Sequence, residues 1–151
     1  MRTILLLGFF SLFISIACSK VNTPTSPDPP MIATSKVLVP AAEFKNVEPG
    51  TNWQAHCGAP ADRRGILYGN VTYSPFTSSV EVLLIPQTNA LSCHGGNVAS
   101  PCAGELVRKI GIDGGINASI FVESGLYCIF ARAIGPQSVS GTMSLSIEYE
   151  K

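Results

Sequence analysis

The feature that most constrains this chain is an alternation of apolar and polar residues with a period of two. In residues 138–149, Val, Gly, Met, Leu, Ile and Tyr occupy every second position, and Ser, Thr and Glu lie between them. Successive side chains of a β-strand point to opposite faces, whereas a helix repeats every ~3.6 residues. This segment therefore predicts a strand with one buried and one wet face. Because it ends in polar residues, we also expect an edge strand that resists pairing with other chains.

β-Branched and aromatic residues dominate six further short runs, as is typical of strands. The predicted strands are residues 36–40, 65–73, 79–85, 105–112, 116–122 and 126–134. Turn residues separate these runs, and no segment has the length and periodicity of a helix. This pattern predicts an all-β fold, either a small antiparallel β-sandwich or a jelly-roll-like domain, formed by residues 36–151.

Two details refine this expectation. The run 126–134 is apolar on both faces except at Arg132, which predicts a central strand covered on both sides. A buried Arg132 would then need a carboxylate or carbonyl partner, because an unpaired buried charge is very costly. The turn sequence Asp113-Gly114-Gly115 predicts a hairpin between the strands that flank it.

The first 17 residues have the pattern of an export signal. Arg2 provides a positive start, and residues 4–16 form an apolar run of 13 residues. A membrane-spanning helix needs about 20 apolar residues. The run therefore predicts a signal peptide at residues 1–17 rather than a membrane span.

The signal ends in Ser15-Ile16-Ala17-Cys18, which resembles the lipobox of bacterial lipoproteins. The resemblance covers only these first 18 residues. It implies cleavage before Cys18, acylation of Cys18 and attachment of the mature chain to a membrane of the bacterial cell envelope. Ser15 departs from the pattern, which usually has Leu or another aliphatic residue there. The same Ser15-x-Ala17 spacing also fits ordinary signal peptidase, which would release a secreted or periplasmic protein.

Residues 18–35 join the signal to the predicted domain and are rich in Pro, Ser and Thr. Such a segment has almost nothing to bury, so it predicts a flexible or polyproline-like tether. A spacer directly after Cys18 is what a membrane-tethered domain requires. Since the usual signal for inner-membrane retention is an Asp after the cysteine, Ser19 favours the outer membrane.

The cysteine count agrees with an acylated Cys18. The chain has five Cys, and setting Cys18 aside leaves Cys57, Cys93, Cys102 and Cys128, which can pair completely. Exported compartments favour disulfides, and the spacing expected of a zinc site is absent. Of the three possible pairings we favour Cys93 with Cys102 and Cys57 with Cys128. No metal or cofactor is expected.

Charge excludes one class of partner. Ten basic residues balance ten acidic ones, so a nucleic-acid binder, which needs a basic surface, is not expected. No nucleophile elbow and no phosphate-binding glycine motif is present, so the sequence predicts no enzyme. The first hypothesis is therefore a lipid-anchored envelope domain with a structural or binding role, whose partners are the membrane through its lipid and envelope proteins or glycans.

Three side chains are candidate ligand contacts. Trp53 could stack on a sugar or anchor a peptide, which would make the domain a carbohydrate- or peptide-binding module; the alternative is that it packs over the end of the sandwich. His56 and His94 neighbour cysteines and are expected in solvated loops. A catalytic role would require a cleft that joins one of them to an acid such as Asp62 or Glu105.

Overall fold

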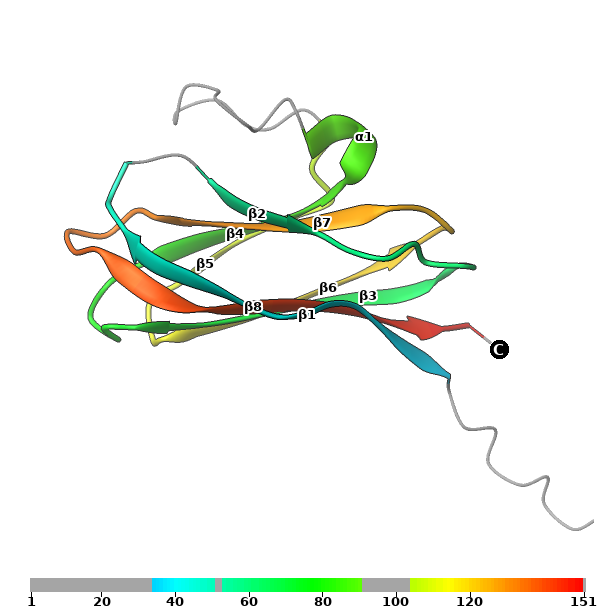
Figure 1. Cartoon of the computed structure of the whole chain (residues 1–151), viewed down its shortest axis with the longest axis horizontal. Coiled ribbons are helices and arrows are strands. Elements are labelled where there is room, and N and C mark those ends of the chain that lie inside the picture. The colour runs from blue at the N-terminus through cyan, green and yellow to red at the C-terminus, as the bar shows by residue number, and fades with distance from the viewer. Residues whose placement is uncertain (1–33, 51–52, 91–103, 151) are drawn as a thin grey trace, which may run out of the picture. The chain divides into compact units, whose positions relative to one another are not determined.

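The strands form two antiparallel sheets that pack face to face, as Figure 1 shows for the computed structural model. The structure describes residues 34–50, 53–90 and 104–150. The elements are β1 (Ser35–Val47), β2 (Gln54–Cys57), β3 (Gly65–Ser74), β4 (Val80–Pro86), α1 (Gln87–Ala90), β5 (Val107–Gly111), β6 (Gly115–Val122), β7 (Tyr127–Ala133) and β8 (Val139–Tyr149). One four-stranded sheet has the order β1-β8-β3-β6, and the other has the order β2-β7-β4-β5. The prediction of an all-β sandwich is confirmed.

The core fills the space between the two sheets. Leu67 and Val71 of β3 and Leu145 of β8 point inward from one sheet and meet Leu84 and Ile129 from the other. Each of these side chains is almost completely buried. Burying a side chain of this size stabilises a fold by roughly 1.5–3 kcal/mol, so the alternating apolar residues of each strand decide which face turns inward.

The central position predicted for the run 126–134 is confirmed. Strand β7 lies between β2 and β4, and all seven of its residues are buried. It therefore contributes to both faces of its sheet, which explains why its sequence shows no polar alternation.

The prediction that the last strand lies at an edge is wrong. Strand β8 pairs with β1 on one side and with β3 on the other. Its alternation is confirmed, because Met143, Leu145 and Ile147 are buried while Ser144 and Ser146 are partly exposed. Polar residues at every second position signal a wet sheet face, and the same residues would also suit a wet edge. The pattern along one strand does not separate the two cases.

The predicted hairpin at Asp113-Gly114-Gly115 is also wrong. The turn is present, with Gly114 at a φ of 79°, but it joins β5 in one sheet to β6 in the other. Strand β6 pairs instead with β3 over eight register positions, from Gly65 opposite Val122 to Thr72 opposite Gly115. A glycine turn predicts a sharp reversal of the chain, but it does not tell whether the next strand pairs in the same sheet. Here the reversal takes the chain from one sheet to the other.

Two stretches of strand have no clear signal in the sequence. Strand β1 continues to Val47, far beyond the predicted run 36–40, and its pairing with β8 shifts register at three places. These irregularities break the period of two, and Pro40 is tolerated because β1 is an edge strand. Strand β2 has only four residues and lies in a segment expected to be a loop. Among the described residues, no helix is both long and apolar enough to cross a membrane.

Candidate binding surfaces

The outer face of the β2-β7-β4-β5 sheet carries a second apolar layer, which we call the covered face. Its buried members are Trp53, Leu83, Ile85, Ala90, Cys128 and Phe130. Helix α1 lies over this face, beside β4 and β7 (Figure 1). The indole of Trp53 meets the ring of Phe130 edge to face, with the ring centroids 6.3 Å apart. Aromatic pairs in this geometry contribute about 0.5–1.5 kcal/mol beyond the area they bury.

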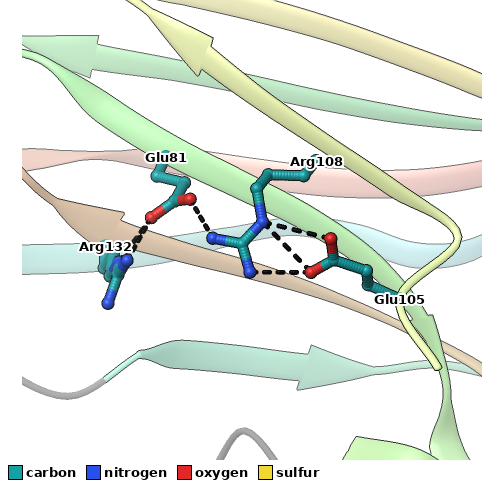
Figure 2. A network of polar contacts seen from close by, with 4 residues as sticks. All are labelled: Glu81, Glu105, Arg108 and Arg132. Atoms are coloured by element: carbon teal, nitrogen blue, oxygen red, sulfur yellow. Dashed lines mark hydrogen bonds and ion pairs between the residues drawn. The ribbon is translucent and has the colours of Figure 1, made fainter. Parts of the chain in front are cut away.

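Four charged side chains of β4, β5 and β7 and of the segment before β5 also belong to the covered face, and Figure 2 shows the contacts that join them. Glu81 of β4 lies at the centre, with a side chain only 5% exposed. Arg132 of β7 donates to one of its carboxylate oxygens from Nε at 2.6 Å, and Arg108 of β5 forms an ion pair with the other. Glu105, which lies just before β5, accepts from Arg108 Nη2 at 2.7 Å. Two carboxylates thus balance two guanidinium groups.

The contacts of this network bind its charged side chains to one another. The hydrogen bonds from Arg108 to Glu105, and then those to Glu81, raise the pKa of Arg108 above its usual value. Arg132 has the carboxylate partner that its buried position requires, as the sequence predicted. Removing one partner from a buried pair leaves an uncompensated charge, which typically costs about 3–5 kcal/mol. The four residues therefore lock β4, β5 and β7 together.

Trp53 packs against the same network. Its side chain is only 7% exposed, and the guanidinium carbon of Arg132 lies 4.4 Å from its ring centroid. One face of the indole is thus occupied by a cation that is itself paired with Glu81. This geometry favours the packing role of Trp53 over a role in stacking on a sugar.

The cysteine pairing is confirmed for one of the two bridges. Cys57 of β2 and Cys128 of β7 lie opposite each other in the register and form a disulfide. Cys57 was expected in a loop, but it lies on the edge strand β2. A cross-link over 71 residues stabilises a domain by roughly 2–4 kcal/mol in the chain-entropy model. Cys93 and Cys102, like Cys18, lie outside the described residues.

Of the two candidate histidines the structure describes His56, and the acids proposed for it pair with cations instead. His56 was expected in a solvated loop, but it lies on β2, partly buried and opposite Ile129. Asp62 accepts from Lys36 at 2.7 Å and Glu105 from Arg108, so both acids bind cations. His94 lies outside the described residues. Within the described part of the chain, no cluster of three or more His, Cys, Asp or Glu could hold a metal ion.

The outer face of the β1-β8-β3-β6 sheet has a different character. Three of its strands turn mostly uncharged polar or aromatic side chains outward, with Ile66 and Glu148 at one end as exceptions, and we call this surface the hydroxyl face. Its members are Tyr68, Asn70, Thr72 and Ser74 of β3, Asn117, Ser119 and Phe121 of β6, and Ser140, Thr142, Ser144 and Ser146 of β8. The register places them in rows across the sheet, such as Asn70 opposite both Ser144 and Asn117.

Hydrogen bonds across the strands order part of the hydroxyl face. The Oγ1 atoms of Thr72 and Thr142 lie 2.9 Å apart, so one hydroxyl donates to the other. Tyr68 donates its hydroxyl to Glu148 at 3.2 Å. Desolvation and then this contact with Glu148 raise the pKa of Tyr68, so the phenol stays neutral and remains a donor. These two hydrogen bonds fix the orientation of the side chains that form them. Neither bond places a charge in the rows of side chains that lie between the two pairs.

A shallow recess of about 460 Å³ ends the hydroxyl face where β3 and β8 meet the turn 112–114. Its lining includes Thr72, Ser74, Ser140, Thr142, Phe76 and Gly114. Phe76 is 70% exposed, yet its ring lies directly against Gly114, where any Cβ would overlap it. Because Gly114 also has a positive φ, only glycine suits this position. The recess thus combines several hydroxyl groups with an exposed aromatic ring that rests on backbone.

A second recess, of about 530 Å³, lies beside α1. Its lining residues are Pro86, Gln87, Thr88, Ser124, Gly125, Leu126 and Tyr127. The hydroxyl of Tyr127 donates to the carbonyl oxygen of Glu123 at 2.8 Å, and burial raises its pKa. Acidic or basic side chains do not contribute to this lining, so it offers little to bind a charged ligand.

The sequence contained part of the signal for the hydroxyl face. The alternating Ser and Thr of 138–149 predicted one wet face, and Asn70 and Thr72 lay on one side of the run 65–73. The surface becomes visible only once β8 is known to lie between β1 and β3, with β6 beyond. Neither protein-family models nor curated proteins yield a match to this chain.

Proposed function

We propose that this chain is a lipid-anchored protein of the bacterial cell envelope whose β-sandwich is a non-enzymatic binding or structural module. The observation that carries the proposal is the lipobox-like sequence Ser15-Ile16-Ala17-Cys18, followed by a spacer and one small domain. Acylation of Cys18 would tether the domain, with the outer membrane favoured by Ser19. Cleavage without acylation would instead give a secreted or periplasmic protein.

The point where the chain enters the sandwich supports presentation on a tether. Thr34 accepts a hydrogen bond from the backbone N–H of Tyr149, so β1 begins beside the end of β8. The recess around Phe76 lies at the opposite end of β3, whose ten residues span roughly 30 Å at about 3.3 Å per residue. The attachment point at residue 34 is therefore at the end of the sandwich remote from that recess.

The pairing of ionisable side chains supports a non-enzymatic role. Glu81 and Glu105 bind Arg108 and Arg132, and Asp62 binds Lys36. A general acid or base must be positioned to exchange protons with a substrate. In the described residues these carboxylates are instead neutralised by neighbouring cations, which suits a stable scaffold.

Intact mass spectrometry of the full chain expressed in a bacterial host tests the proposal. We expect a mature chain that begins at Cys18 and carries a diacyl- or triacylglyceryl group. Reduction should add two hydrogens for each of two bridges, Cys57–Cys128 and Cys93–Cys102.

The matched control is Cys18→Ala. This variant should keep both bridges but lose the lipid and leave the membrane fraction. A wild-type chain that starts at Cys18 without a lipid would overturn the anchored protein and support the secreted one. Four free thiols in the folded protein would reopen a metal site at the cysteines and histidines.

A further inference from the structure

We infer that the hydroxyl face and the recess around Phe76 form a binding surface for a neutral polysaccharide. The inference rests on the proposed function, since it assigns a ligand class to the tethered module. It uses a part of the molecule that is separate from Trp53, Asp62 and His56. Four observations support it. The surface is mostly neutral, and its side chains can donate and accept hydrogen bonds. Exposed aromatic rings lie at its two ends, and the distance between these rings suits a polymer.

Neutrality is the most unusual property of this surface. A soluble domain is best designed with Lys, Arg, Glu and Asp at about 25–35% of its surface positions. The charges nearest to the hydroxyl face are already engaged: Glu43 pairs with Lys45 on β1, Glu148 accepts from Tyr68, and Lys109 of β5 donates to the carbonyl oxygen of Asn117. An anionic polymer would need basic side chains, and none stands in the rows between β8 and β6.

The chemistry of the rows suits sugar hydroxyl groups. Each Ser or Thr hydroxyl can donate one hydrogen bond and accept others, and each Asn amide does both. In the pair of Thr72 and Thr142 only one hydroxyl donates to the other, so the second keeps its proton for an outside acceptor. The row of Asn70, Ser144 and Asn117 adds two amides side by side across three strands.

Exposed aromatic rings flank the polar rows. Phe76 is 70% exposed and is positioned by Gly114, while Phe121 is 52% exposed and lies opposite Ile66 at the other end. The C–H face of a pyranose ring is apolar and packs on such rings, which bury large areas at low entropic cost. A ring held on backbone loses little freedom on binding.

The distance between these rings favours a polymer. Ile66, which is opposite Phe121, and Ser74, beside Phe76, are eight residues apart on β3, or roughly 26 Å at about 3.3 Å per residue. A small sugar would contact only one end, whereas an extended chain could contact both. A protein partner fits less well, because the cores of protein interfaces are depleted in Ser.

Depletion binding to insoluble cellulose, chitin and starch tests this inference with the full chain in a detergent that contains no sugar. We expect retention by at least one of these polymers and none by the anionic polymer alginate. Phe76→Ala should weaken binding at least tenfold, and Asn70→Ala combined with Asn117→Ala should do the same. The matched control, Ile110→Ala, removes an exposed apolar side chain of β5 in the other sheet and should leave binding unchanged.

A second measurement needs no variant. Soluble cello- or chito-oligosaccharides should shift the amide resonances of Thr72, Asn117 and Ser144 in wild-type protein and leave those of β7 unchanged. No retention by any neutral polymer, or shifts confined to the other sheet, would overturn the inference. So would salt-sensitive binding to alginate. These outcomes leave the lipid-anchored module standing, because its own test is the mass of Cys18.

Discussion

The two sheets share one core but turn opposite kinds of surface outward. The covered face buries Trp53, Phe130, Glu81 and Arg132, and leaves Arg108 and Glu105 of the same network partly exposed. The hydroxyl face exposes mostly neutral side chains on β3, β6 and β8, with Glu148 at one end. Glu81 and Arg132 are thus more buried than the neutral polar side chains of the hydroxyl face.

The difference teaches which sheet holds the domain together and which is available to a partner. On the covered face the four charged groups of the network pair with one another, because a buried charge without a partner is too costly. On the hydroxyl face the side chains are largely exposed, so we expect their substitution to change the free energy of unfolding little. The following substitutions probe this division, beginning with the largest expected effect.

The first test compares two phenylalanines on the two outer faces. Phe130→Ala should lower the free energy of unfolding by about 3–5 kcal/mol, because the ring is fully buried and leaves a cavity. Phe121→Ala, on the hydroxyl face, should cost less than about 1 kcal/mol, because half of that ring is already exposed. Denaturant unfolding followed by circular dichroism measures both.

Equal losses for the two variants would break the comparison. They would mean either that the covered face is open in solution or that Phe121 is buried by a partner such as a second copy of the chain. Analytical ultracentrifugation of the wild-type protein separates these cases, since only a second copy raises the mass.

The sequence was sufficient where a strand's position determines its pattern. Strand β7 is apolar on both faces because it is covered on both faces, and this made its central place predictable. The need of Arg132 for a carboxylate followed from the same pattern. Both of these inferences depend on burial, which can be read from the residues of one strand. The cross-link of Cys57 to Cys128 was predicted instead from the number of cysteines and the oxidising compartment.

The sequence was insufficient where position depends on pairing. It did not show that β8 is an inner strand, because a wet face and a wet edge use the same residues. It did not show β2 at all, since four residues around Ala55 and His56 are too few to establish a period. The identity of Glu81 as the partner of Arg132 required the register of β4 against β7. The hydroxyl face likewise exists only as the sum of three strands.

The second test addresses the charges of the covered face. Glu81→Gln keeps the shape of the side chain but gives Arg132 a neutral partner and leaves Arg108 paired with Glu105, so it should cost about 2–3 kcal/mol. Glu105→Gln is the matched control at the more exposed end of the same network, where the side chain is 28% exposed. It should cost no more than about 1 kcal/mol, because solvent screens that pair.

Urea unfolding at low and at high salt measures both variants. The cost of Glu81→Gln should persist in high salt, whereas the cost of Glu105→Gln should shrink, because solvent ions reach only the outer pair. If Glu81→Gln proved neutral, the network would not lock the strands, and stability on this face would have to come from the apolar layer alone.

The third test probes the hydrogen-bonded pair on the hydroxyl face. Thr142→Ala removes one hydroxyl of the contact between Thr72 and Thr142, and cross-strand pairs of this kind contribute only about 0.2–1 kcal/mol. We expect thermal unfolding of this variant to begin within a few degrees of the wild type. A loss as large as that of Glu81→Gln would show that the hydroxyl face also holds the domain together. In that case its neutral side chains would have a structural role, and the separation of stability from binding between the two sheets would fail.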